Sequence, residues 1–335
     1  MRQGHYIIPV FIPDLACPHQ CIFCNQKKIS GHIAIPSIED VKQIIEKHLS
    51  TIPKGSKIEI GFFGGNFTGV DINLQKEFLT VAKNFIDNGK VLSIRLSTRP
   101  DYINENILKF LKSFSVSTIE LGAQSFDDEV LRLSGRGHDS ETTIKSSVLI
   151  KQYGFDLGLQ MMIGLPGDTK ENSIITAHKI VELGAENTRI YPALVIKDTA
   201  LEKLFHENKY KPLSIEESVD WVKDIYKIFE DAGITILRVG LHPSEGLINK
   251  EVLIAGPFHV SFRELVLAEI WKEIFQPLLK QNKKENILIT VPSEEFNYAI
   301  GYEASNKKML QQHFKNVKFV ANASLKGRNF NVDYC

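Results

Sequence analysis

Three of the four cysteines in this chain lie within eight residues, in the pattern Cys17-x3-Cys21-x2-Cys24. Thiolates are soft ligands that suit iron–sulfur clusters, and three of them can hold three irons of a [4Fe–4S] cube. The fourth iron then has no protein ligand, so it can bind a small molecule. A structural zinc site is the alternative, with His19 as the fourth ligand that zinc normally requires. His19 lies inside the tight loop, however, and no second ligand pair is evident in the sequence.

The composition is that of a globular protein with a sizeable core. The chain has 335 residues, of which 43% are hydrophobic and 24% are charged. Lys plus Arg and Asp plus Glu each number 40, which argues against a strongly basic nucleic-acid binder but is compatible with a local basic face. The apolar stretch 6–13 is too short for a membrane span and lacks the layout of a signal peptide. We therefore expect a cytoplasmic protein with no membrane partner, in which clustered cysteines bind metal more often than they pair.

Strand-like apolar runs alternate with helical patterns along the chain. We expect strands at Tyr6–Phe11, Ile58–Phe63, Leu92–Ser97, Thr118–Gly122, Leu157–Ile163 and Arg189–Val195, with a further run at Ile234–Val239. We expect helices at Ile38–Leu49, Leu74–Asp87, Glu105–Ser113, Ser140–Tyr153, Glu171–Leu183 and Ile215–Ala232, with Ser37 and Ser140 as plausible N-caps. This alternation predicts an α/β fold with a parallel sheet and right-handed crossovers, and six such units fit a partial (β/α)6 barrel of the TIM type. In such barrels the chemistry lies at the C-terminal ends of the strands, and the cysteine loop follows the first strand there.

The pattern changes after Gly246. We expect a helix at Ser261–Gln276, a strand at Ile287–Val291, a helix at Asn306–His313, a strand at Val317–Val320 and then a polar tail. The sequence thus predicts a core barrel over residues 1–245 and a small C-terminal α/β appendage over residues 246–335.

Several further segments follow the cysteines along the sequence. They are Gly64-Gly65-Asn66, Ser97-Thr-Arg-Pro-Asp-Tyr102, Glu120-Leu-Gly-Ala-Gln-Ser125, Arg136-Gly-His138, Gly164-Leu-Pro-Gly167 and Ile190-Tyr-Pro-Ala-Leu-Val-Ile196. With them the chain resembles the radical S-adenosylmethionine (SAM) superfamily. From Cys17 to about Glu245 it resembles the radical-SAM core of the elongator catalytic subunit, and it is also similar to the oxygen-independent coproporphyrinogen III oxidases. We expect the acetyltransferase domain of the elongator subunit to be absent, because the residues after 246 leave no room for it.

The resemblance implies the cofactors and the type of reaction. It implies a [4Fe–4S] cluster on Cys17, Cys21 and Cys24, which favours the cluster over zinc, and SAM chelated to the open iron. One electron, from a reductant such as flavodoxin or ferredoxin, would cleave the sulfonium to methionine and a 5′-deoxyadenosyl radical. That radical would abstract a hydrogen atom from the substrate, while the protein positions the cofactors.

The resemblance also implies a set of SAM contacts. They are Phe23, Gly64, Gly65, Asn66, Ser97, Arg99, Gln124, Arg136, Gln160 and Tyr191. Glycines let the backbone carbonyls approach the ammonium group, but the family often has an acidic residue or Thr where Asn66 stands, which weakens a role for this side chain. Alternatives stay open: Arg99 as the ion-pair partner of Asp101 in a helix-entry turn, and Arg136 paired with Glu120.

Four residues beyond these segments are candidates for contacts with the substrate: Arg238, His242, His259 and Glu264. The alternative is that they form an ion-paired interface between barrel and appendage. Cys335 is the last residue; it is either incidental or a thiol that reaches the substrate if the tail folds back.

Three functions compete. Analogy to the elongator branch favours a radical SAM enzyme that modifies an RNA base in tRNA or rRNA, although fold-level analogy does not determine the substrate. A radical oxidoreductase acting on a small, porphyrinogen-like molecule is the alternative. A non-catalytic iron–sulfur protein is disfavoured, because an electron carrier needs no adenosine pocket.

Overall fold

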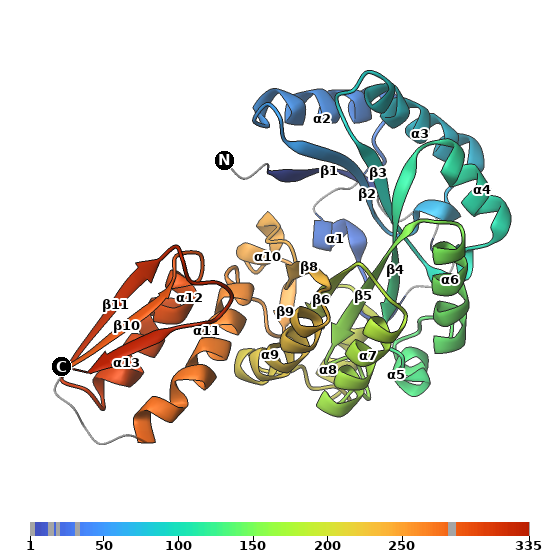
Figure 1. Ribbon diagram of the computed structural model, residues 1–335. Helices are drawn as coiled ribbons and strands as arrows, with labels where there is room; N and C mark the ends of the chain where they lie inside the picture. The colour runs from blue at the N-terminus through green and yellow to red at the C-terminus, as the bar shows by residue number, and fades with distance from the viewer. Residues whose placement is uncertain (1–3, 13–16, 18–20, 31–33, 281–285, 335) are drawn as a thin grey trace.

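The computed structural model describes residues 4–12, 17, 21–30, 34–280 and 286–334 of the chain. Among these residues, seven parallel strands form one curved sheet in the order β1-β2-β3-β4-β5-β6-β8 (Figure 1). Their bounds are β1 (His5–Ile12), β2 (Lys57–Gly64), β3 (Ser93–Thr98), β4 (Val116–Gln124), β5 (Asp156–Ile163), β6 (Asn187–Pro192) and β8 (Thr235–Val239). The predicted partial barrel is confirmed, and β8 extends it by one strand beyond the six expected units.

Six longer helices cover the outer side of this sheet (Figure 1). They are α2 (Ile38–Thr51), α3 (Ile72–Asp87), α4 (Glu105–Ser113), α6 (Ser140–Gln152), α7 (Lys170–Glu182) and α9 (Ile215–Asp231). Ser37 caps α2 in a capping box with Asp40, as its sequence suggests. The N-cap of α6 is Asp139 rather than the expected Ser140, because the Asp139 carboxylate accepts the Thr142 N–H.

Shorter helices lie in the connections. They are α1 (Gln26–Ser30), η1 (Phe67–Gly69), η2 (Pro100–Tyr102), α5 (Asp128–Leu133), α8 (Ala200–His206) and α10 (Glu245–Ile248). Most of these segments lie at the C-terminal ends of the strands, where they shape the loops around the site. Within the described part of the chain, no helix is both long and apolar enough to cross a membrane.

The C-terminal part has a sheet and a core of its own. Strand β10 (Asn286–Pro292) pairs in parallel with β11 (Asn316–Asn322) and antiparallel with β12 (Asn331–Tyr334). Helices α11 (Phe262–Phe275), η3 (Gln276–Lys280), α12 (Phe296–Ile300), η4 (Tyr302–Ala304) and α13 (Ser305–Gln311) complete this unit. The predicted polar tail contains a strand at 331–334 that the sequence did not indicate, because pairing with β10 satisfies the backbone of this short, partly polar segment.

Helix α11 joins the two parts. Phe262 and Val266 in its first half belong to the barrel core, whereas Trp271 and Phe275 in its second half belong to the core of the three-stranded sheet. The short strands β7 (Val195–Ile196) and β9 (Leu253–Ala255) also pair, which ties the segment after β8 to the barrel. The division at 245/246 stays a prediction.

Candidate active site

Two adjoining cavities open at the C-terminal ends of the strands. The polar cavity, of about 360 Å³, is lined by Cys17, Cys21, Phe23, Cys24, Asn25, Gln26, Lys27, Gly64, Gly65, Ser97, Thr98, Arg99, Gly122, Gln124, Arg136, Gln160 and Asp198. The apolar cavity, of about 480 Å³, is lined by Ile7, Pro9, Phe11, Phe23, Cys24, Gln26, Ile29, Phe63, Gly64, Ser97, Gln124, Gln160, Met162, Arg189, Tyr191, Pro192, Leu194, Ile196, Leu237, Arg238, Leu241 and His242. Both have the size at which proteins hold small molecules. They share wall residues from the cysteine loop and from β2 to β5, so ligands in the two cavities would contact some of the same side chains.

All three clustered cysteines line the polar cavity. Cys21 is buried, and its Sγ accepts a hydrogen bond from Nη1 of Arg136 at 3.3 Å. Among the residues with a described position, no group of three His, Cys, Asp or Glu side chains stands close enough together to hold a metal ion. The donor set fits an iron–sulfur cluster all the same, since three thiols and two guanidinium groups, which would offset thiolate charge, line one cavity. His19 and Cys335 lie outside the described residues.

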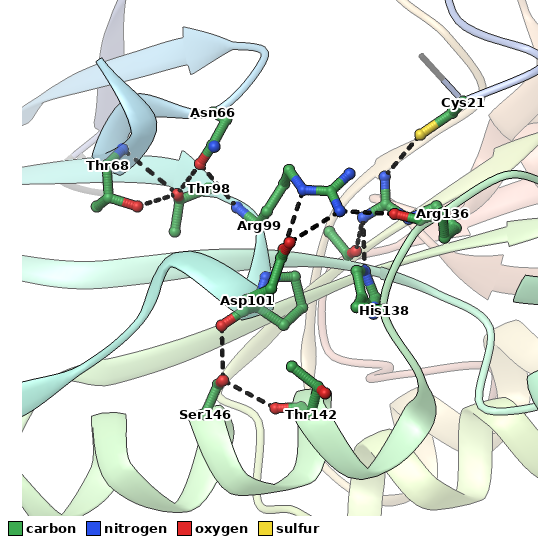
Figure 2. Close-up of polar contacts among 12 residues, drawn as sticks. Cys21, Asn66, Thr68, Thr98, Arg99, Asp101, Arg136, His138, Thr142 and Ser146 are labelled. Carbon is green, nitrogen blue, oxygen red and sulfur yellow. Dashed lines mark hydrogen bonds and ion pairs between the residues drawn. The ribbon is translucent and has the colours of Figure 1, made fainter. Parts of the chain in front are cut away.

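Arg99 is held by the protein itself (Figure 2). Its Nε and Nη2 donate to the two carboxylate oxygens of Asp101 at 2.9 and 3.0 Å, and Nη2 also donates to the carbonyl oxygen of Arg136 at 2.6 Å. Burial opposes its charge, but Asp101 and the thiols of Cys21 and Cys17 outweigh that effect and raise the pKa of Arg99. The ion-paired turn that the sequence offered as an alternative is therefore present, and the Arg99 guanidinium still lines the polar cavity.

Arg136 has no carboxylate partner among the described residues. Besides Cys21, it donates to the carbonyl oxygen of Gly122, and its Nη2 lies 3.1 Å from Nε2 of His138 (Figure 2). Burial and the charge of Arg136 lower the pKa of His138 to about 4, so this imidazole is neutral near pH 7 and accepts from Arg136. The alternative of an Arg136–Glu120 pair is not formed, because Glu120 binds other arginines.

Positive φ angles mark the ends of β2 and β4. Gln124 has φ 68°, in the left-handed region that non-glycine residues rarely adopt, next to an irregularity in the β4–β5 register. Its Oε1 is buried and has no hydrogen-bond partner in the described structure. Gly64 has φ 129°, and a Cβ there would stand 2.1 Å from the carbonyl oxygen of Ile12. Only glycine fits where β2 passes this close to the strand that leads into the cysteine loop.

A chain of buried ion pairs fills the barrel beneath the cavities. Glu120 accepts from Nη1 of Arg95 at 3.0 Å and from Nε and Nη2 of Arg189 at 2.6 and 3.2 Å. Arg95 also lies 3.2 Å from Glu59. Gln160 donates to Ser97 at 3.1 Å and lies 3.4 Å from Glu120, so this network reaches the wall that both cavities share.

Sequence reasoning missed Arg189. Burial opposes its charge, but Glu120 outweighs this and raises the pKa of Arg189. Its guanidinium lies 4.9 Å from the centre of the Phe63 ring and lines the apolar cavity. The available signal was its spacing from Tyr191, two residues along β6, since residues two apart in a strand share a face. Burial raises the pKa of the Tyr191 hydroxyl, so it stays protonated.

Of the other residues predicted to contact SAM, most line the cavities but Asn66 does not. Phe23, Ser97, Gln160 and the two glycines line one or both cavities. Asn66 lines neither; its Oδ1 accepts from Thr98 Oγ1 at 2.5 Å and from the Arg99 N–H at 3.3 Å (Figure 2). This side chain therefore fastens the β2 loop to the end of β3, and its role in cofactor binding stays a prediction.

The four substrate-side candidates separate into two pairs. Arg238 and His242 line the apolar cavity, with 3.2 Å between Arg238 Nη2 and His242 Nδ1. His259 and Glu264 are not among the residues that line either cavity. His259 accepts from the Ser261 N–H at 3.1 Å and packs edge-on against Tyr302, with 5.2 Å between ring centres.

The ion-paired interface between barrel and C-terminal part exists, but other residues form it. Lys227 lies 2.9 Å from Glu273, and Arg328 pairs with Glu230. The roles of all four candidates stay predictions.

Comparisons with known proteins agree with this geometry. A family model described as the radical SAM superfamily matches residues 12–180, and one described as the radical SAM C-terminal domain matches residues 185–272. The chain is 30% identical to the tRNA uridine(34) acetyltransferase of Methanocaldococcus jannaschii over 258 residues, which cover 65% of this chain and 48% of that protein. It is 23% identical to the heme chaperone HemW of Bacillus subtilis over 261 residues, 76% of this chain and 66% of that protein.

The solved structure of Elp3 from the archaeon Methanocaldococcus infernus, with an N-terminal deletion, superposes with a TM-score of 0.67 at 22% identity. The superposition covers 82% of this chain and 64% of that one, and it shows a shared fold. The chain spans about half the length of the first curated relatives it matches. The two resemblances predicted from the motifs, to elongator catalytic subunits and to coproporphyrinogen oxidase-like proteins, are confirmed.

Proposed function

Because the chain belongs to the radical SAM superfamily of enzymes, we propose that it cleaves SAM reductively at a [4Fe–4S] cluster held by Cys17, Cys21 and Cys24 and modifies a base of tRNA or rRNA. Such a cluster, when bound, supplies the electron that breaks the sulfonium of SAM into methionine and a 5′-deoxyadenosyl radical. The observation that carries the proposal is the polar cavity, in which the three cysteines meet Arg136 and Gln124.

Different residues around the cavities would bind the amino acid part and the adenosine part of SAM. The side-chain amide of Gln124 lines the polar cavity and would suit the ammonium group of SAM, and the guanidinium groups of Arg99 and Arg136 suit its carboxylate. Phe23 and Tyr191 offer aromatic faces to the adenosine on the side of the apolar cavity. The hydrogen bond from Arg136 to Cys21 would stabilise thiolate charge and orient this ligand.

The support for an RNA substrate comes from similarity to a tRNA-modifying enzyme, not from the net charge of this chain. The chain matches a tRNA uridine(34) acetyltransferase along about half of that protein, whereas its own formal net charge is zero. RNA would therefore bind at local surfaces of the chain. A flavodoxin-like or ferredoxin-like reductant completes the proposal, and the cytoplasmic location stays a prediction.

A small, porphyrinogen-like substrate is the second candidate. The observation that favours it is the apolar cavity, which has room for a small molecule beside the polar cavity. The similarity to a heme chaperone supports it as well.

Anaerobic reconstitution tests the chemistry. The protein reconstituted with iron and sulfide and supplied with SAM and dithionite should yield 5′-deoxyadenosine and methionine in equal amounts. Cys24→Ala should lose bound iron and sulfide and form no 5′-deoxyadenosine. The matched control is Cys335→Ala, which removes the one cysteine outside the triplet. A Cys24→Ala protein with the iron content of the unchanged chain contradicts the ligand assignment.

Nucleoside profiles test the substrate class. RNA from cells lacking the gene should miss one modified nucleoside, and the gene should restore it whereas a Cys24→Ala copy should not. Identical profiles in all three strains contradict the RNA proposal and favour the small-molecule candidate.

A further inference from the structure

The wall of the apolar cavity carries positive charge without acidic side chains. Arg189 and Arg238 belong to its described lining, and that lining contains no aspartate or glutamate. A cavity wall that carries positive charge and no carboxylate attracts an anion, and it does so even where, as at the half-buried Arg238 and the exposed His242, solvent weakens the attraction. The two arginines differ in the partners that balance their charge.

Arg189 is already neutralised. Its Nε and Nη2 both bind Glu120, and its guanidinium carbon lies over the Phe63 ring, 4.9 Å from the ring centre. These contacts hold the Phe63 ring at the cavity wall and leave Arg189 little net charge to offer. Arg189 therefore shapes the cavity more than it binds a charged ligand.

Arg238, at the end of β8, is different. No carboxylate of the described residues lies within 4 Å of its guanidinium, and its partner is Nδ1 of His242. Burial, and then the charge of Arg238, lowers the pKa of His242, so this imidazole is neutral near pH 7. A neutral imidazole that accepts at Nδ1 carries its proton on Nε2. The pair thus presents a guanidinium and an N–H donor, with no acceptor between them.

The rest of the apolar cavity suits a flat, uncharged body. Phe11 and Phe63 contribute rings from β1 and β2, and Leu237 and Leu241 contribute aliphatic side chains from β8 and the loop after it. Strands β1 and β8 are the two edges of the curved sheet, so these walls come from opposite edges (Figure 1). Aromatic and aliphatic walls stabilise a planar apolar group by burial and stacking.

We propose that the apolar cavity binds the second substrate of this enzyme as an anion on a flat apolar body, with its carboxylate or phosphate held by Arg238 and His242 and its body beside Phe63. The inference rests on the proposed function, since it assigns the substrate end of the same site. In the proposed binding mode, Arg99 and Arg136 hold the carboxylate of SAM in the polar cavity. Arg238 lines the apolar cavity and is therefore available to another ligand.

Benzoate and benzamide form a matched pair of probes, because they share a ring and differ in charge. Ligand-observed NMR measures their binding to the reconstituted, SAM-loaded enzyme. Benzoate should bind about tenfold more tightly than benzamide, as expected for one charge-assisted hydrogen-bonded contact. Arg238→Gln should remove this preference, and Arg238→Lys should restore part of it.

Arg132→Gln is the control variant, because Arg132 is an exposed arginine paired with Glu129 outside both cavities. It should keep the full preference for benzoate. If Arg238→Gln fails to fold, as judged by thermal melting, His242→Ala replaces it and should weaken the preference. The inference is overturned if the unchanged enzyme binds both probes equally or if the folded variant keeps the preference.

5′-Deoxyadenosine formation in the same samples separates the two proposals. SAM cleavage without a preference for benzoate overturns the anion site alone. A cluster-loaded enzyme that prefers benzoate but does not cleave SAM overturns the proposed reaction and leaves the anion site standing.

Discussion

Arginines in two regions of this barrel differ in what balances their charge. In the interior, Arg95 and Arg189 both pair with the carboxylate of Glu120. At the strand ends, Arg136 contacts a thiol, a carbonyl and an imidazole, and Arg238 contacts an imidazole. Among the described residues, no carboxylate lies within 4 Å of either guanidinium. The interior charges are balanced within the fold, whereas Arg136 and Arg238 keep charge that the proposed anionic ligands would balance.

Glu120→Gln should have the largest effect on stability. The change leaves Arg95 and Arg189 beside a neutral amide in the barrel interior and should cost on the order of 3–5 kcal/mol of the free energy of unfolding. Urea denaturation followed by circular dichroism measures it. Glu129→Gln, which breaks the exposed pair with Arg132, is the matched control and should leave the free energy of unfolding nearly unchanged. Equal losses in both variants would remove the distinction between the two regions.

Arg136→Met should act on the cluster more than on the fold. The change removes a hydrogen bond and a positive charge next to Cys21, so the reduction potential of the reconstituted cluster should fall. A redox titration followed by electron paramagnetic resonance measures this potential. Arg136→Lys retains the charge and should give an intermediate value. An unchanged potential in Arg136→Met would mean that this arginine serves only the fold.

His138→Asn should change the pH dependence of stability. The pKa of His138 is about 4 in the folded chain, against 6.5 for an ordinary histidine. Between these values the unfolded chain binds more protons, so stability falls as the pH drops from 6.5 towards 4, by on the order of 1–3 kcal/mol. The variant should lose less stability over this window in urea denaturation. If the stability of both proteins falls equally with pH, then burial and the charge of Arg136 do not lower the pKa of His138.

Glu273→Gln should have the smallest effect. Glu273 pairs with Lys227 between the barrel and the C-terminal part, and its side chain is 51% exposed. Solvent screens such pairs, so the change should cost about 0.5 kcal/mol or less. A loss comparable to that of Glu120→Gln would show that exposed pairs hold this interface together.

Local patterns predicted most of the fold. The barrel strands and outer helices begin and end within a few residues of their expected positions, because apolar periodicity and caps act over short distances. Strand β12 escaped prediction, because its few residues become a strand only when β10 supplies hydrogen-bond partners. Helix α11 likewise shows no sign in its sequence that its two halves belong to different cores.

The candidate site was predicted less evenly. The cysteine triplet, Gly64 and Gln124 could be recognised from residue type and order, and all of them line the polar cavity. Residue type does not show which of several possible partners a guanidinium meets. From the sequence, Arg99 could bind SAM or Asp101 and Arg136 could bind SAM or Glu120, and the contact of Arg136 with Cys21 appeared only in the structure.

The sequence by itself determined the alternation of strands and helices, the thiol donor set and the family, since these depend on residues close together in the chain. Only the tertiary structure decided which charges are balanced. It brought Glu120 to Arg95 and Arg189, which lie on different strands, and left Arg238 in a cavity lined from both edges of the sheet. The physical reason is that ion pairing and cavity shape depend on the meeting of distant segments, which local pattern does not specify.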